Sequence, residues 1–118
     1  MSTAQEILDS FIGINGFTIN ADTTEFRLET MTAILGIKPL DNHRAVCDGC
    51  GQIVVGIKDR KQRFYRDKPV FDWKVYLRVD RRRVNCPRCG VRSERFPFVD
   101  GRSRFTRRFE LMVFNDIL

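Results

Sequence analysis

The sequence Cys-Asp-Gly-Cys-Gly at residues 47–51 recurs in form as Cys-Pro-Arg-Cys-Gly at residues 86–90, and these two units hold every cysteine of the chain. A spacing of two residues lets one tight turn aim both sulfurs at a single point, and two such turns supply the four thiolates of a tetrahedral zinc site. The glycine after each second cysteine lets the backbone turn away without a Cβ clash. We therefore predict a structural Zn²⁺ site formed by Cys47, Cys50, Cys86 and Cys89.

Four cysteines could also form disulfides, a redox motif or an iron site. Disulfides need an oxidising compartment, yet residues 1–11 are a mixed polar stretch without the apolar segment of a signal peptide. A redox Cys-x-x-Cys motif usually occurs once, in a strand–helix context. Iron in a four-cysteine site would give the same sequence pattern, and zinc is preferred because it is the common structural metal. A site closed by four thiolates has no open position for water, which indicates no catalytic role.

The length of 118 residues suits one domain with a modest core. No apolar run approaches the roughly 20 residues of a membrane span. We therefore predict a soluble, intracellular protein of one domain, or one domain of a larger protein, with no membrane partner.

The charges divide the chain into two unlike parts. Residues 1–43 carry two basic and six acidic groups, whereas residues 44–118 carry nineteen basic and nine acidic groups. The excess of cations therefore coincides with the cysteines, and arginine dominates it. Such asymmetry favours a polyanionic partner, of which nucleic acid is the usual one, and the arginine fork matches phosphate oxygens and guanine edges. A solvated, arginine-rich face is the alternative.

Local patterns predict the elements of the first part and of the C-terminus. Ile7, Leu8, Phe11 and Ile12 share one helical face, and glycines end this first helix. Near the C-terminus, apolar residues from Phe105 onward recur at helical spacing, with Ser103 or Thr106 as the candidate cap. Short strands are expected at residues 17–20, 25–28 and 31–37.

The cysteine-rich part predicts strands around the metal-binding turns, which together make a zinc ribbon. Residues 52–57 and 63–65 read as strands separated by a charged turn at residues 59–62, and residues 73–80 alternate with period two. The distance between the cysteine pairs requires long hairpin arms or an insertion. The predicted fold class is α+β, with a helix and β-meander at residues 1–43, a four-cysteine ribbon at 44–100, and a basic segment that begins a helix at 101–118.

The stretch from Cys47 to Phe109 resembles the N-terminal zinc-finger domain of the ISL-three family of bacterial insertion-sequence transposases. The arginine pair that follows the strand at residues 75–79, just before the second cysteine pair, is the most specific match. The further matching pieces are the two cysteine units, residues 63–67, Phe96-Pro97-Phe98, and Arg104 to Phe109.

The resemblance implies a function without chemistry in this segment. In that family the zinc-binding domain recognises terminal-repeat DNA and precedes a helix-turn-helix region and a catalytic domain with a metal-binding acidic triad. The catalytic domain would lie beyond Leu118, so we expect no enzymatic activity here. The expected partners are double-stranded DNA, a second copy, and the remaining transposase domains, in the bacterial cytoplasm with the nucleoid. We expect no small-molecule substrate.

The candidate DNA-contacting cations lie near the cysteine turns, along the strands that join them, and before the last helix. Positive charge at the start of a helix is electrostatically unfavourable, which hints at an anion there. The cations of residues 60–66 are expected to gather at a hairpin tip. The candidates are Arg60, Lys61, Arg63, Arg66, Arg78, Arg81, Arg82, Arg83, Arg88, Arg102, Arg104, Arg107 and Arg108.

The leading hypothesis is a DNA-binding module that recognises transposon ends. The alternative is a zinc-stabilised protein-interaction or oligomerisation module of a transposase-like or regulatory protein, in which the basic charge is incidental. An enzyme is the weakest hypothesis because the sequence offers no paired-carboxylate, nucleophile–base or phosphate-loop constellation.

Overall fold

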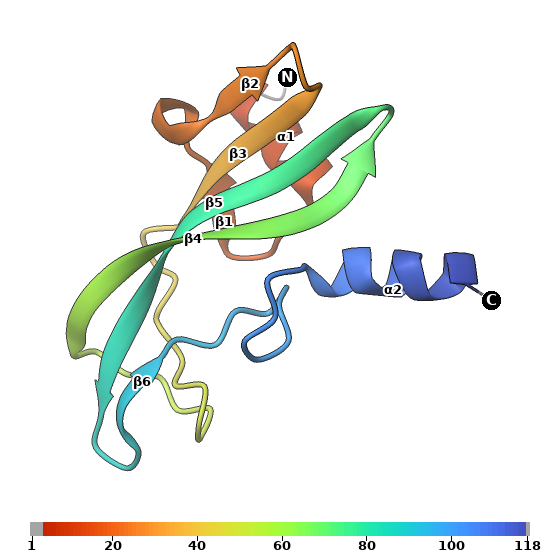
Figure 1. The fold of residues 1–118 in the computed structure, drawn as a ribbon. Helices are drawn as coiled ribbons and strands as arrows, with labels where there is room; N and C mark the ends of the chain where they lie inside the picture. The colour runs from red at the N-terminus through yellow and green to blue at the C-terminus, as the bar shows by residue number, and fades with distance from the viewer. Residues whose placement is uncertain (1–3, 118) are drawn as a thin grey trace.

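A computed structural model describes residues 4–117 and confirms the α+β class (Figure 1). Two helices flank a six-stranded sheet, and a short 3₁₀ helix, η1, lies between the first two strands. In chain order the elements are α1 (Ala4–Ile12), β1 (Phe17–Ile19), η1 (Ala21–Thr23), β2 (Glu25–Arg27), β3 (Thr32–Pro39), β4 (Ile57–Val70), β5 (Trp73–Cys86), β6 (Gly90–Ser93) and α2 (Arg107–Ile117).

Strand β5 is the central strand of the molecule. It pairs with β4 along almost its whole length in an antiparallel hairpin. On its other edge it pairs first with β3, in parallel, and then with β6, antiparallel. One strand therefore joins the N-terminal elements to the cysteine turns, and Figure 1 shows this long hairpin twisting strongly between the two ends of the molecule.

The N-terminal elements are tied together by Asp9 of α1. Its carboxylate accepts hydrogen bonds from the backbone N–H of Ile19 at 2.8 Å and from the hydroxyl of Thr18 at 2.7 Å. Burial alone would raise the pKa of Asp9, but these hydrogen bonds lower it below its ordinary value. The helix is thereby fixed against β1, which pairs in turn with β3.

Apolar residues gather in two clusters. The cluster around the cysteines comprises Ala45, Cys47, Val54, Val84 and Cys86. The larger cluster crosses the predicted boundary between residues 43 and 44, since α1, β1 and β3 pack with the hairpin and the segment after β6. The three-part division of the chain stays a prediction. The larger cluster consists of Ile12, Ile14, Phe17, Ile37, Tyr65, Leu77, Val79, Phe96 and Val99.

The hairpin corrects two of the sequence-based expectations and confirms a third. Residues 59–62 are not a turn but lie inside β4, and the reversal comes later, at Phe71 and Asp72. Residues 52–57 form a loop with one isolated bridge from Ile53 to Val46 rather than a strand, and β4 begins only at Ile57. The expected long hairpin arms are confirmed, because both strands run for 14 residues between the two cysteine pairs.

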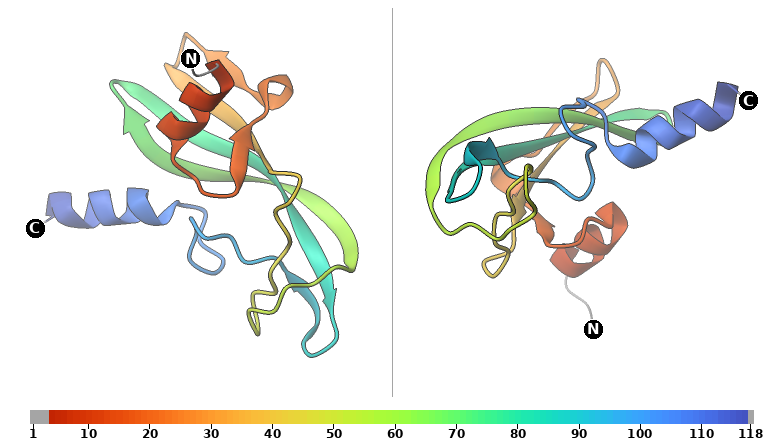
Figure 2. Two further views of the ribbon diagram at one scale, coloured as in Figure 1. Left: turned by 180° about the vertical axis from the view of Figure 1, so that it is seen from behind. Right: turned by 90° about the horizontal axis from the view of Figure 1, so that it is seen from below.

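Helix α2 projects away from the body of the molecule, as two opposite views agree (Figures 1 and 2). Its cap is Thr106, one of the two predicted candidates, whose hydroxyl accepts a hydrogen bond from the N–H of Phe109 at 3.3 Å. Neither helix in the described part of the chain is long and apolar enough to cross a membrane.

Candidate metal centre and nucleic-acid interface

The two cysteine turns are closed by local backbone hydrogen bonds and held side by side by a short bridge. The N–H of Gly51 donates to the carbonyl of Cys47 at 2.9 Å, and Gly51 and Gly90 both adopt positive φ, near +77° and +79°. Glycine tolerates this conformation, as the sequence predicted. Cys47 and Glu94 form an antiparallel bridge that brings the first turn against the chain leaving β6.

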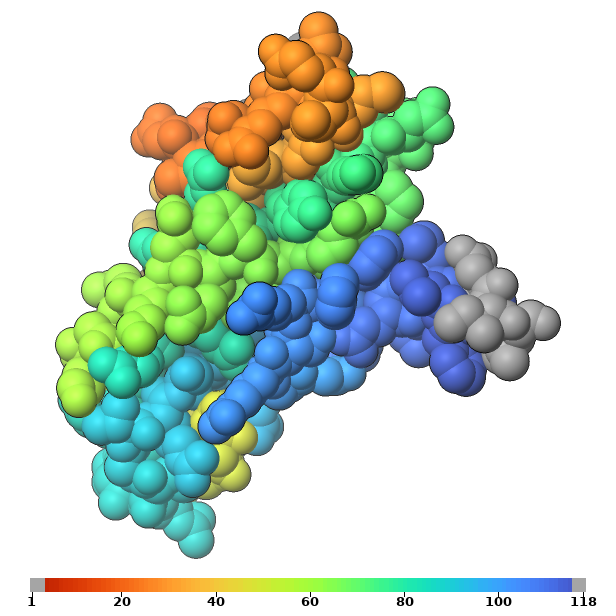
Figure 3. Space-filling view, in the orientation of Figure 1, coloured from red at the N-terminus to blue at the C-terminus, as the bar shows by residue number. Residues whose placement is uncertain are grey.

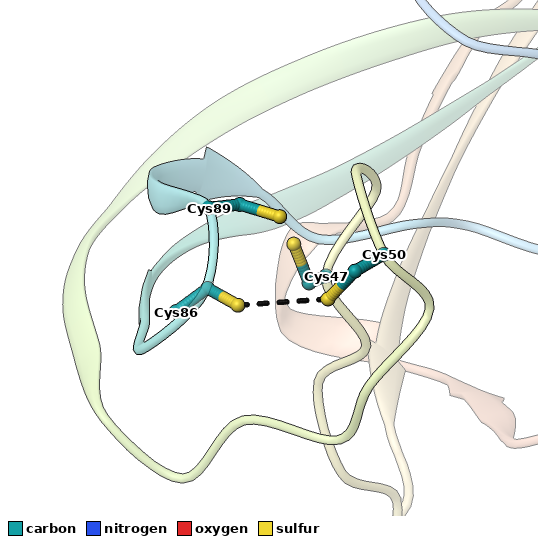
Figure 4. Close-up of side chains that lie close together, drawn as sticks. All are labelled: Cys47, Cys50, Cys86 and Cys89. Carbon is teal, nitrogen blue, oxygen red and sulfur yellow. Dashed lines mark hydrogen bonds between the residues drawn. The ribbon is translucent and has the colours of Figure 1, made fainter.

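The four sulfurs converge on one point from two elements, as Figure 4 shows. All four Sγ atoms lie within 4.8 Å of one another, and those of Cys50 and Cys86 are 3.6 Å apart. Cys47 and Cys86 are buried, while Cys50 and Cys89 are partly exposed. Four convergent sulfur donors on two rigid turns match the ligand set of a closed structural zinc site.

Ionisation of the cluster also fits a bound cation. Hydrogen bonds from the backbone N–H groups of Cys89 and Arg88 lower the pKa of Cys86 to about 7. Burial, followed by the nearby sulfurs of Cys50 and Cys47, raises the pKa of Cys89 to about 12. One thiol therefore ionises readily while a further ionisation is costly, and a divalent cation would offset the charge of the remaining thiolates.

A buried ion pair joins β5 to the chain just beyond the second turn. Arg82 Nε and Nη2 donate to the Glu94 carboxylate at 3.0 and 2.9 Å, and the backbone N–H of Arg82 donates to the same carboxylate at 2.9 Å. The neighbouring Arg81 Nε donates to the carbonyl of Glu94 at 2.9 Å. Both arginines were predicted to contact DNA, but the structure uses them to fix the base of the metal centre.

Several other predicted DNA-contacting arginines are held by acidic partners. Arg83 Nε donates to Asp59 at 2.7 Å, which raises the pKa of Arg83, and Arg78 lies 3.5 Å from Glu25. The pKa of Asp59 is lowered, chiefly by the same hydrogen bond from Arg83. A guanidinium already bonded to a carboxylate is less available to a phosphate.

The charges at the start of α2 are balanced within the protein. Arg107 Nε donates to Asp100 at 2.8 Å, and Arg108 Nε donates to the buried carboxylate of Asp67 at 2.7 Å. Arg108 also donates to the carbonyl of Ile12 at the end of α1. The anion expected near these cations is therefore a pair of protein carboxylates.

Arg66 and Arg78 also pack on aromatic rings. The Arg66 guanidinium lies 5.3 Å from the ring centre of Tyr76 and 5.1 Å from that of Phe109, and Arg78 lies 5.2 Å from the ring centre of Phe64. The stack on Phe109 connects the hairpin to α2, while the other two join β4 to β5.

Four of the exposed predicted cations lie on β4 or in the segment that precedes α2. Arg66 donates its backbone N–H to the carbonyl of Arg104, so the segment before α2 lies against the outer edge of β4, as Figure 3 shows for the blue segment beside the light-green strand. The group has no hydrogen bond to an acidic side chain and no ion pair within residues 4–117. We name it the β4 cation row: Lys61, Arg63, Arg102 and Arg104.

Two further predicted cations, Arg60 and Arg88, are also exposed. Arg60 belongs to β4 but alternates to the other face from Lys61 and Arg63, and Arg88 is exposed within the second cysteine turn. The expected tip cluster at residues 60–66 is therefore wrong, because these residues are spread along a strand.

His43 stays outside the sulfur cluster and packs on Phe17 with ring centres 5.0 Å apart.

Two residues that matter in the structure are not identified by the sequence patterns. Glu94 accepts hydrogen bonds from Arg82. The sequence feature that could have identified it is its position as the one acid between Arg92 and Arg95, shortly after the second cysteine turn. Lys38 lies at the end of β3 beside the hairpin. The sequence feature that could have identified it is that it is one of two cations in an acidic stretch.

Comparison with known proteins agrees with the geometry of the cysteines. Residues 43–89 match a family model described as the zinc-finger of transposase IS204/IS1001/IS1096/IS1165. A curated relative, the transposase for insertion sequence element IS1001 from Bordetella parapertussis, is 36% identical over 64 residues. That alignment covers 53% of this chain and only 16% of the relative. No solved structure matches the chain.

The match and the sulfur geometry fall on the same residues. A zinc ribbon with four thiolate ligands is a non-catalytic module, because its metal has no open coordination position. Residues 43–89 therefore match the zinc finger of these transposases, and the four cysteines that they contain are able to bind a structural zinc ion.

Proposed function

We propose that this chain is the DNA-binding module of a transposase, that it recognises the ends of the mobile element, and that it contributes no chemistry itself. The observation that carries the proposal is the β4 cation row. Its four side chains are exposed and without carboxylate partners, while Arg82, Arg83, Arg107 and Arg108 are bonded to acids. Cations that the fold does not neutralise are those that can replace the counterions of a phosphate backbone.

The zinc ribbon supports this function by holding the row in place. Arg82 and Glu94 link β5 to the chain just beyond the second cysteine turn, and residues 73–84 of β5 pair with residues 57–70 of β4. A metal that closes the cysteine turns thus fixes the strand that carries Lys61 and Arg63. The row then needs little ordering when DNA binds, which favours affinity.

Binding to defined duplexes tests the proposal. The zinc-loaded chain would be titrated into fluorescent duplexes taken from the two ends of its own element and into an unrelated duplex of the same length and composition. Tighter binding to the end duplexes is the expected result. Equal binding to all duplexes would limit the function to non-specific DNA binding, and no binding to any duplex would overturn it.

Subunit assembly, with a second copy of this chain as the partner, is a second candidate function. The specific observation is an apolar groove of about 310 Å³ between α1 and the hairpin. Phe11 and Phe26, which line it, remain 68% and 66% exposed, and exposed apolar surface of this kind often marks an interface. Sedimentation distinguishes the functions, since a dimer that binds no DNA favours assembly.

A further inference from the structure

A polar cleft of about 380 Å³ lies where the end of β3 meets the hairpin. The N-terminal elements contribute Asn20 and Lys38 to its walls, β4 contributes Arg60 and Gln62, and β5 contributes Arg78. The strand alternation places Arg60 and Gln62 on the opposite face of β4 from Lys61 and Arg63. The cleft is therefore separate from the β4 cation row.

The charges of the cleft are positive in excess. Lys38 and Arg60 form no hydrogen bond or ion pair through their side chains within residues 4–117, whereas Arg82 is neutralised by Glu94. Arg78 donates to the carbonyl of Thr23 at 3.0 Å and approaches Glu25. Asp80 is the one acidic residue among the described lining residues.

Hydrogen-bond donors in the cleft wall lack acceptors. The Nε of Arg78 is buried and has no partner within the described residues, although a buried donor of this kind is normally bonded. The side-chain oxygen of Asn20 already accepts from the N–H of Asp22, which leaves the amide nitrogen of Asn20 to donate. Cations together with unused donors are the chemistry that binds a tetrahedral oxyanion.

We propose that this cleft binds one phosphate group of a nucleic-acid backbone, an inference that rests on the proposed DNA-binding function. The lining residues include no aromatic ring on which a base could stack, which favours a backbone phosphate over a nucleotide. The cleft and the β4 cation row lie on opposite faces of one strand. The major groove of B-DNA is wide enough to admit a two-stranded ribbon. With the hairpin in that groove, the cleft and the row can contact the two phosphate backbones that border it.

The salt dependence of DNA binding tests this site with a matched pair of lysines. Lys38→Gln removes a cation of the cleft, and Lys74→Gln removes another exposed cation at the far end of β5. Loss of one phosphate contact lowers the slope of log affinity against log salt by about 1 in magnitude. We expect that change for Lys38→Gln only, with thermal midpoints equal to that of the parent. Identical slopes for both variants would overturn the site while leaving DNA binding by the parent intact.

A second measurement identifies the source of the phosphate. Amide resonances of Asn20, Lys38 and Gln62 would be followed while either inorganic phosphate or a duplex is added to the zinc-loaded chain. We expect the duplex to shift them at far lower concentration than phosphate does. Saturation by inorganic phosphate without competition from the duplex would overturn the nucleic-acid assignment. If the parent binds no duplex at all, the proposed function fails, and the nucleic-acid source of the phosphate fails with it.

Discussion

Arg82 and Glu94 form a buried ion pair with two hydrogen bonds between their side chains, at 3.0 and 2.9 Å. The Glu94 side chain is 1% exposed and that of Arg82 is 12% exposed. Arg82 belongs to the central strand β5, and Glu94 forms a backbone bridge with Cys47 of the first cysteine turn. The pair therefore links the sheet to both cysteine turns, and its arginine is structural although it lies in the most basic run of the chain.

Glu94→Ala should lower the free energy of unfolding by about 3 kcal/mol, because removing one partner leaves a buried charge uncompensated. Glu29→Ala is the matched control, since Glu29 is exposed and its removal should change stability little. Urea denaturation of the zinc-loaded proteins measures both. Equal stability of the two variants would show that the ion pair does not support the fold.

The junction of α2 with the hairpin should respond to acid. Burial by itself would raise the pKa of Asp67, but hydrogen bonds from Arg108 and Thr106 lower it below its ordinary value. A carboxyl with a lowered pKa in the folded state stabilises the protein above its unfolded pKa, about 4. That stability is lost as the pH falls through the folded pKa.

Asp67→Asn isolates this contribution. At pH 7 the variant should be less stable by on the order of 2 kcal/mol, because hydrogen bonds to a charged group are lost. The difference from the parent should shrink below about pH 4, where the parent carboxylate also becomes protonated. Thermal melts of both proteins from pH 7 to pH 3 measure it, and a difference independent of pH would contradict the role of the charge.

Close packing of η1 on β3 depends on Gly36. A Cβ atom at this position would lie 1.8 Å from the Thr23 hydroxyl and 2.8 Å from the Asn20 carbonyl. Gly36→Ala should therefore cost about 2 kcal/mol through overpacking. Gly56→Ala meets no atom closer than 3.7 Å and serves as the control. If both variants melt at the same temperature, η1 is not packed as described.

Zinc should be required for the ribbon to fold. Cys86→Ser removes one of four convergent ligands, and structural zinc supplies on the order of 10 kcal/mol of folding free energy in small domains. We expect loss of stoichiometric zinc by elemental analysis and loss of cooperative melting. Asp48→Ser, within the first cysteine turn but not a ligand, should retain both. Full metal content and stability in Cys86→Ser would contradict the zinc assignment.

The metal centre could be predicted because its information is local. The two-residue spacing and the glycines that follow fix each turn, and Gly51 and Gly90 do adopt the expected positive φ. Period-two alternation likewise identified β5, whose residues Val75, Leu77 and Val79 are all buried. In each case the signal lies within a few residues of the feature that it predicts.

The misread parts depend on partners that are distant in the chain. Residues 59–62 have the charges of a turn, but in the structure they pair with residues 80–83 of β5. The acidic partners of Arg83 and Arg108 are Asp59 and Asp67, which lie 24 and 41 residues away in sequence. Only the fold therefore separates arginines that support the structure from arginines that can meet DNA.

The salt dependence of duplex binding by the zinc-loaded chain tests the central claim most directly. Four unneutralised cations in the β4 cation row predict a slope of log affinity against log salt of at least about 4 in magnitude. Replacing Arg63 and Arg104 by glutamine should lower it by about 2, whereas replacing Arg107, which is bonded to Asp100, should not change it. Binding that is independent of salt, or equal slopes for all these proteins, would contradict the account.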